Sequence, residues 1–151
     1  QLQKFNHEKV VYVEAESRKI GTLHVPDILL EQMRQSPCIR IDASLEARVA
    51  YLIEDYAYFI EDSNHLMLTI DYLKELHSNE TLAHWKQLIQ NKEWPILVTE
   101  LLEKHYDALY RRSQNSNYVN YEKAQTYSSA DLSAKGIEIL AKQILMGTHH
   151  A

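Results

Sequence analysis

The sequence predicts a helix-rich α/β protein with a partial parallel sheet of about two to three strands, followed by a mainly helical region. Only 3 Gly and 3 Pro occur in 151 residues, so few residues interrupt helices. Strand-like and helix-like segments alternate near the amino end, which is typical of parallel strands. From residue 61 onward, amphipathic helical patterns follow one another. We therefore expect one α/β portion over 1–60 and a helical extension over 61–151.

The first strand is expected over about 9–14, where four successive apolar residues have the composition of a strand buried on both faces: Val10, Val11, Tyr12 and Val13. A charged loop follows. Pro26 suits the first turn of a helix, and Asp27 places a carboxylate at the positive end of its dipole. A helix is therefore expected to run to about Gln35.

A second short strand is expected from Cys38 to Ile41, ending at Asp42. Ser44 is then expected to cap a helix over about 45–60. The order strand, helix, strand, helix with short connections predicts parallel pairing of the two strands.

The helical extension is expected to hold three amphipathic helices over about 63–77, 79–91 and 93–112, with Ser63 and Asn79 as the caps of the first two. The inward face of the second helix is expected to consist of Leu82, Trp85, Leu88 and Ile89. The remaining segments are expected to be a polar turn at 114–117, an edge strand near 118–127 and a last helix over 131–146 closed by Gly147.

The net charge of −5 argues against a protein that coats DNA through a basic surface. The single cysteine, Cys38, cannot form an internal disulfide, and no apolar run approaches the roughly 18 residues of a membrane helix. We therefore expect a cytoplasmic protein with no membrane partner. Because no signal-peptide pattern is present and the chain starts at Gln1, we expect it to be part of a longer protein.

A dense cluster of charged and hydrogen-bonding groups follows the first expected strand: Glu14, Glu16, Ser17, Arg18, Lys19 and His24. In open α/β sheets, ligands bind at the carboxyl ends of strands. An acidic residue at such a place can hold Mg²⁺ through its water shell, which gives Glu14 an indirect metal role. The alternative is a salt-bridged loop or a carboxylate that only caps a neighbouring helix.

A second cluster ends the helix expected over 93–112: His105, Tyr106, Asp107, Tyr110, Arg111, Arg112 and Ser113. Arg111 and Arg112 alone would be typical of cations complementing a helix dipole. The arginines also offer planar groups suited to phosphate, and the tyrosines could stack on an unpaired base.

The remaining histidines and the cysteine indicate structural roles. His65, His77 and His84 have no metal-ligand partners at helical spacing, so core or surface positions are expected and no metal site is predicted. Cys38 lies inside a strand pattern and is interpreted as a buried, unreactive thiol.

Two segments of this chain resemble the carboxyl-terminal part of tRNA 2-selenouridine synthase. They are VYVEAESRKIGTLHVPDILLEQMRQSPCIRIDASLEARVAYLIEDY and, later, LLEKHYDALYRRS. The resemblance covers about Val10 to Ser113. It implies the second half of a P-loop-type domain plus a helical extension.

The resemblance also implies an activity and its partners. The family replaces the 2-thio sulfur of the wobble uridine in tRNA with selenium from selenophosphate, and it can pass through a geranylated thiouridine. Its members join a rhodanese-like domain with a reactive cysteine to a P-loop domain. By position, Glu14, Glu16, Ser17 and Arg18 would form one wall of the substrate or phosphate site, with Gly21 at a close turn and His24 facing the same pocket. The cluster from His105 to Ser113 would form the second wall and receive tRNA.

The chain departs from the family pattern in two respects. No GxxxxGK[ST] occurs in the sequence, and Cys38 does not stand where the family's catalytic cysteine would. We therefore expect no catalytic residue and no bound cofactor in this chain alone. Any nucleotide with Mg²⁺ would need the phosphate-loop segment, and the rhodanese-like segment would supply the covalent chemistry.

Two other functions remain open at the level of sequence. The chain could be a fragment of a P-loop small-molecule kinase, because a strand, an acidic residue and an Arg-bearing helix also occur there. It could instead be a non-catalytic helical interaction module, with 61–113 as its surface. An unpaired strand edge would also permit self-association.

Overall fold

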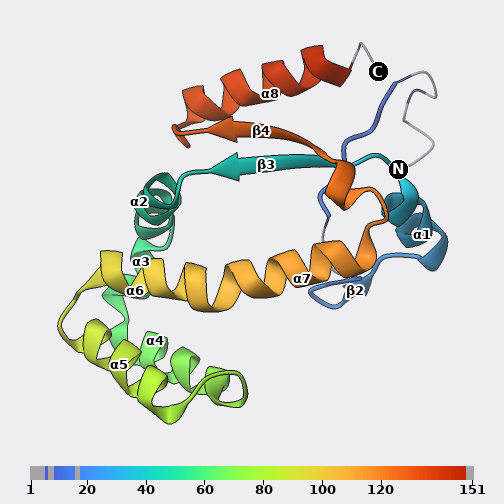
Figure 1. Cartoon of the computed structure of the whole chain (residues 1–151). Coiled ribbons are helices and arrows are strands. Elements are labelled where there is room, and N and C mark those ends of the chain that lie inside the picture. Colours follow the sequence, from blue (N-terminus) through green and yellow to red (C-terminus); the bar gives the residue numbers. More distant parts are fainter. Residues whose placement is uncertain (1–5, 7–8, 16–17, 149–151) are drawn as a thin grey trace. The chain divides into compact units, whose positions relative to one another are not determined.

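The computed structural model describes residues 6, 9–15 and 18–148 of the chain (Figure 1). Two compact units are present, and each is described by itself. Unit 1 comprises Gln1–Ile39 with Arg112–Gln125, and unit 2 comprises Arg40–Arg111 with Thr126–Ala151. The expected division of the chain at residue 60 stays a prediction.

Unit 1 contains a short hairpin followed by a helix. Strand β1 (Lys19–Ile20) pairs antiparallel with β2 (Leu23–His24). Gly21 between them has φ +60°, the left-handed conformation that glycine adopts without a steric penalty. Helix α1 (Asp27–Gln35) then begins directly after Pro26, as the sequence predicts. The guanidinium of Arg18 lies 2.7 Å from the Asp27 carboxylate in the first turn of α1.

The end of α1 is closed by the segment that follows helix α7 (Asp107–Asn117). The Val119 amide donates to the carbonyl of Arg34 at 3.1 Å, and the Asn120 side chain donates to the carbonyl of Gln35 at 2.9 Å. These bonds satisfy carbonyls that have no partner within the last helical turn. A single 3₁₀ turn, η4 (Tyr121–Lys123), follows.

The polar turn expected at 114–117 is wrong, because these residues are the last turn of α7. Gln114 is buried at 4% exposure, and its side-chain amide donates to the Ala15 carbonyl at 3.2 Å. A buried amide requires such a partner. The Asn117 side chain donates back to the Ser113 carbonyl at 2.8 Å, so polar residues here extend the helix.

The expected buried strand over 9–14 is also wrong. Residues 9–15 have no regular secondary structure, and Val10 and Val13 are 70% and 57% exposed. A β-branched run needs neighbouring strands to pair its backbone and a layer to cover it. Within the described residues, no strand pairs with this segment.

Unit 2 carries most of a two-stranded sheet. Strands β3 (Ile39–Ala43) and β4 (Gln125–Ser129) pair, and their arrows point the same way in Figure 1. The helix-rich α/β class with a small parallel sheet is therefore confirmed. The partner of β3 comes from the second half of the chain, at and just beyond the edge strand expected near 118–127.

Helix α8 (Ala134–Thr148) follows β4 and approaches it closely. A methyl group placed at Gly147 would collide with the hydroxyl oxygen of Tyr127, so any larger residue there would require the Tyr127 side chain to shift. The expected helix is thus present but begins three residues late. Gly147 lies inside the helix rather than closing it.

The other helices of unit 2 lie between the two strands in sequence. They are α2 (Leu45–Asp55), α3 (Ala57–Glu61), α4 (Ser63–Asp71), the 3₁₀ turn η2 (Tyr72–Glu75), α5 (Asn79–Gln90), α6 (Trp94–Leu101) and the π turn η3 (Leu102–Tyr106). The helix expected over 45–60 breaks at Tyr56. The helix expected over 93–112 is divided by η3.

The core of unit 2 is formed by α4, α5 and α6. Trp85, Ile89 and Leu97 are its fully buried large side chains. The core also holds Ile70, Leu82 and Leu88. The inward face predicted for the helix over 79–91 is therefore confirmed, because all four of its expected residues are buried.

Candidate functional site

The second expected cluster lies on η3 and the beginning of α7. A π turn adds a residue to the helical circumference, and such turns occur frequently at functional sites. His105 lies inside this turn and is only 9% exposed. The cluster is therefore built on a local irregularity in a helix that otherwise runs from Trp94 to Asn117.

His105 is bonded to a second histidine that the sequence did not single out as its partner. His77 Nε2 and His105 Nδ1 are 3.0 Å apart. Burial, and secondarily the charge of His77, lowers the pKa of His105, which favours the neutral ring. His77 lies just after η2, and its 28-residue separation from His105 gives no periodic signal in the sequence.

A partly buried carboxylate contacts Trp85, the same residue whose ring packs against His77. Glu100 on α6 accepts hydrogen bonds from Trp85 Nε1 at 2.9 Å and His84 Nε2 at 3.2 Å, and it lies 2.8 Å from Lys104 Nζ. The hydrogen bond from Lys104, with those from Trp85 and His84, lowers the pKa of Glu100 against the opposing effect of burial. Glu100 therefore remains ionised and joins α5, α6 and η3.

Asp107, the next expected site residue, is bound within the protein. Both of its carboxylate oxygens accept from the Arg48 guanidinium, at 2.6 and 2.9 Å. The hydrogen bonds from Arg48 lower the pKa of Asp107, while the same pair raises the pKa of Arg48. Asp107 thus fastens α7 to α2, a contact that sequence reasoning missed because Arg48 lies 59 residues earlier.

The outward residues of the cluster differ from these two. Tyr106 and Tyr110 are 60% and 57% exposed and are one helical turn apart. Arg111 is exposed, and its Nε donates to the Asp107 carbonyl at 3.2 Å. Arg112 and Ser113 are also exposed but belong to unit 1. Tyr106, Tyr110 and Arg111 form what we term the outer face of unit 2.

The first expected cluster lies in unit 1, where the described members are exposed. Glu14 belongs to the irregular segment, Arg18 pairs with Asp27, Gly21 makes the hairpin turn, and His24 ends β2. Glu16 and Ser17 lie outside the described residues. The expected pocket between this cluster and the one at 105–113 stays a prediction.

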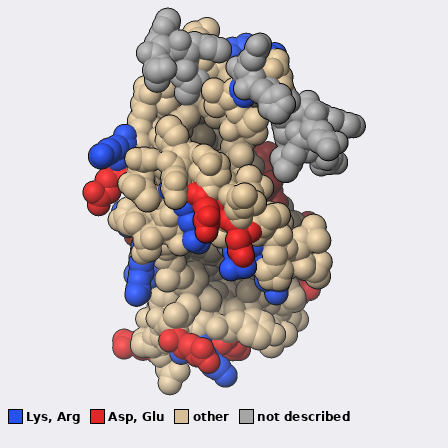
Figure 2. All heavy atoms as spheres, turned by 90° about the vertical axis from the view of Figure 1, so that its right-hand side faces the viewer, with Lys and Arg blue, Asp and Glu red and all other residues tan. Residues whose placement is uncertain are grey.

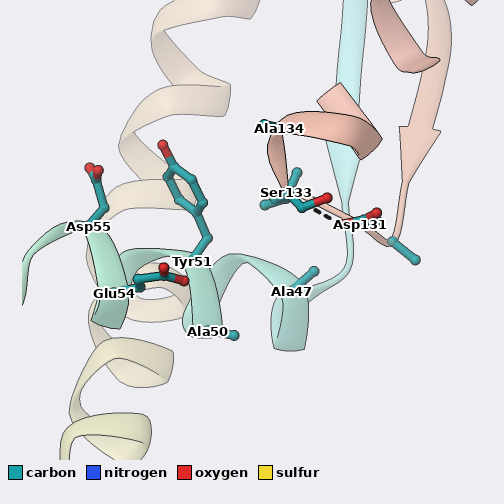
Figure 3. Close-up of a pocket in the computed structure, with 10 residues that line it drawn as sticks. Ala47, Ala50, Tyr51, Glu54, Asp55, Asp131, Ser133 and Ala134 are labelled. Atoms are coloured by element: carbon teal, nitrogen blue, oxygen red, sulfur yellow. Dashed lines mark hydrogen bonds between the residues drawn. The ribbon is translucent and has the colours of Figure 1, made fainter. Parts of the chain in front are cut away.

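An open pocket of about 850 Å³ lies in unit 2 between α2 and the segment 130–134 (Figure 3). Its wall includes Tyr51, Glu54 and Asp55, none of which the sequence singled out. Asp131 is engaged locally, since it accepts from the Ser133 amide at 2.8 Å. Glu54 and Asp55 give the pocket an acidic edge, so it disfavours phosphate.

Charges of both signs are mixed on the face drawn in Figure 2, where Lys and Arg side chains lie among Asp and Glu side chains. Within the described residues, no three His, Cys, Asp or Glu side chains form a metal-binding group. In the same part of the chain, helices are too short or too polar to cross a bilayer.

Cys38 lies directly before β3 and is less buried than expected, and its lack of reactivity stays a prediction. Its side chain is half-buried, and its Sγ lies 3.7 Å from the Ser36 carbonyl oxygen. Burial raises the pKa of the Cys38 thiol. A raised pKa keeps the thiol protonated at neutral pH, whereas a nucleophile must be a thiolate.

These observations define a helix-rich α/β protein in which the candidate site residues from His105 to Ser113 lie on a π turn and on the helix after it. Comparison with known proteins then confirms the resemblance to the tRNA 2-selenouridine synthase family. Residues 1–69 match the family model described as the tRNA 2-selenouridine synthase AAA domain.

Two curated relatives are named tRNA 2-selenouridine synthase. The protein from Alcanivorax borkumensis is 27% identical over an alignment that covers 66% of this chain and 35% of the relative. The protein from Sulfurovum sp. (strain NBC37-1) is 24% identical, with 80% and 32% covered. The chain thus spans about a third of the length of these relatives. No solved structure matches it.

Proposed function

We propose that this chain is the carboxyl-terminal part of a tRNA-modifying transferase that exchanges sulfur for selenium at the 2-position of the wobble uridine. Selenophosphate would be the donor and geranylated thiouridine an intermediate. The observation that carries the proposal is the match of residues 1–69 to the tRNA 2-selenouridine synthase AAA domain. The names of the two relatives support the same reaction.

Within such an enzyme, the chain would bind substrate rather than perform the covalent step. The sequence holds no GxxxxGK[ST], and the one thiol is kept protonated by burial. Nucleotide and Mg²⁺ would therefore be held with a phosphate-loop segment, and a rhodanese-like segment would carry the reactive cysteine. Glu14, Arg18 and His24 are the described candidates for the phosphate side. Cytoplasmic location and self-association stay predictions.

The outer face of unit 2 is the proposed tRNA contact. Exposed aromatic rings stack on unpaired bases, and an arginine side chain binds the phosphate between them. Tyr106 and Tyr110 present two rings at helical spacing, and the exposed Arg111 follows Tyr110 in the helix. His105 and Asp107 are bonded to His77 and Arg48, so we assign the tRNA contact to their exposed neighbours instead.

The experiment measures binding of a 2-thiouridine tRNA to the full-length protein over a series of salt concentrations. Arg111→Ala should weaken binding and reduce the salt slope by about 1, because one phosphate contact is lost. Tyr106→Ala should weaken binding by about tenfold, whereas Tyr106→Phe keeps the ring and should not. Lys142→Ala, which removes an exposed cation on α8, is the matched control.

An unchanged salt slope in Arg111→Ala, or equal effects of the two Tyr106 variants, would place the tRNA elsewhere. A selenium-transfer assay tests separately whether this chain only binds substrate while another segment performs the covalent step. The 151-residue chain alone should produce no 2-selenouridine, and robust turnover by it would contradict the proposed role.

A helical interaction module is the second candidate, favoured by a specific observation. His105 and Asp107 are the motif residues with the strongest structural bonds, and both stabilise the packing of unit 2. Under this function, Tyr106→Ala would leave tRNA binding intact. The enzyme's activity per folded molecule would then survive changes at 105–111.

A further inference from the structure

Four aromatic rings connect the core of unit 2 to its outer face. Trp85 is fully buried, and its ring lies edge-on to His77 with 4.8 Å between centroids. The His77 and His105 rings are 5.1 Å apart and share the 3.0 Å contact between nitrogens. His105 in turn meets the exposed ring of Tyr106 edge-on at 5.0 Å. We term Trp85, His77, His105 and Tyr106 the ring chain.

The contact between His77 and His105, in the middle of the ring chain, depends on how many protons the two rings carry. A hydrogen bond between His77 Nε2 and His105 Nδ1 needs one nitrogen with a proton and one without. Neutral rings and a singly protonated pair both satisfy this condition. When both rings are protonated, two N–H donors and two positive charges face each other, and the contact cannot persist.

A second proton on the pair would have no ion-pair partner among the described residues. Among the described residues, no carboxylate forms an ion pair with His77 or His105. Glu100 on α6 is occupied by Trp85, His84 on α5 and Lys104 on η3. Lys104 pairs with Glu100, and Lys86 on α5 pairs with Asp71 on α4.

We propose that His77 is a positioning residue, which holds His105 in the π turn while the two rings share a hydrogen bond and releases it when both are protonated. The orientation of Tyr106 then depends on pH, because its ring packs against His105. This step rests on the proposed function only in giving Tyr106 a tRNA partner. The pH-dependent contact itself is a property of unit 2.

The test is amide hydrogen exchange of the 151-residue chain at pH 7.5 and pH 5, expressed as protection factors so that the intrinsic pH dependence is removed. Amides of η3 (Leu102–Tyr106) should lose about tenfold or more of their protection at the lower pH, because the helix opens locally once the contact between the two rings is lost. Amides of α5 around Leu88 should retain theirs.

Three variants make the test specific. His77→Gln keeps a hydrogen-bonding amide that does not titrate, so protection of η3 should no longer change with pH. His77→Ala should give low protection at both pH values. His84→Gln alters a neighbouring histidine outside the ring chain and should behave as the unchanged protein. Constant protection in the unchanged chain, or an equal loss in His77→Gln, overturns the inference.

The link to function has its own measurement. In the full-length protein, tRNA affinity should fall more between pH 7.5 and 5.5 than it does in His77→Gln. If Tyr106→Ala binds tRNA normally, the proposed tRNA face fails, while the exchange result still decides the inference. If exchange shows no pH-dependent opening, the inference fails whatever the tRNA result.

Discussion

The side chains of the HYDALYRRS segment point in different directions, some into the protein and others toward solvent. Asp107 accepts from Arg48 and His105 bonds His77, whereas Tyr106 and Tyr110 are exposed. Adjacent residues of a helix point to different sides, so one short motif can both fasten a helix and present a surface. Residue types alone did not separate these two roles.

The Arg48–Asp107 pair allows a prediction for a single contact. Both side chains are mostly buried, with 31% and 25% exposure, and the pair makes two hydrogen bonds. Arg48→Met should lower the free energy of unfolding by about 2 kcal/mol, because the Asp107 carboxylate loses its charged donor. Urea unfolding followed by circular dichroism measures this.

Arg18→Met is the matched control for that prediction. The Arg18–Asp27 pair is exposed at 58% and 70%, so water screens it. Its loss should change the free energy of unfolding by less than about 0.5 kcal/mol. Equal effects of the two substitutions would mean that the Arg48–Asp107 contact contributes little despite its geometry.

At the scale of elements, local signals in the sequence located most helices. Pro26 with Asp27 and the cap Ser44 stand where α1 and α2 begin, and Ser44 accepts from the Ala47 amide at 3.2 Å. Such signals are short-range, so they can be read from neighbouring residues. The face buried by α5 was predictable for the same reason, since its period is local.

Elements that depend on distant partners were not predictable. The apolar run from Val10 to Val13 has the composition of a strand, but pairing depends on other segments. The polar segment at 114–117 is helical because Gln114 finds the Ala15 carbonyl 99 residues away. The His77–His105 contact is missing from any local pattern for the same reason.

One element boundary provides a prediction that separates neighbouring residues. Asn79 was expected to cap α5, but Ser78 does so, since its hydroxyl accepts from the Thr81 amide at 3.2 Å. Ser78→Ala should therefore lower the free energy of unfolding by about 1 kcal/mol. Asn79→Ala should not, because Asn79 is already a helical residue and alanine favours helix. Thermal unfolding of both variants decides between the two caps.

At the scale of the whole chain, three groups with lowered pKa values make the folded state less stable as the pH falls. His105 has a pKa below its ordinary 6.5, and Glu100 and Asp107 have values below 4.5 and 3.8. In each case the unfolded chain binds protons that the folded chain does not. Stability is therefore complete above the ordinary pKa of each group and is lost as the pH falls toward its folded value.

Acid should therefore destabilise the folded chain in two pH ranges, which we call the first and second windows. The first begins below about pH 6.5, where the folded state resists protonation of His105. The second begins below about pH 4.5, where the folded state resists protonation of Glu100 and Asp107. Asp107→Asn removes a titrating group and should reduce the slope of unfolding free energy against pH in the second window only. Arg48→Met should reduce the same slope, because without the guanidinium the pKa of Asp107 returns toward its ordinary value. Urea unfolding at intervals from pH 8 to pH 3 measures both slopes. A slope in the second window that neither substitution changes would show that acid sensitivity there does not arise from the Arg48–Asp107 pair.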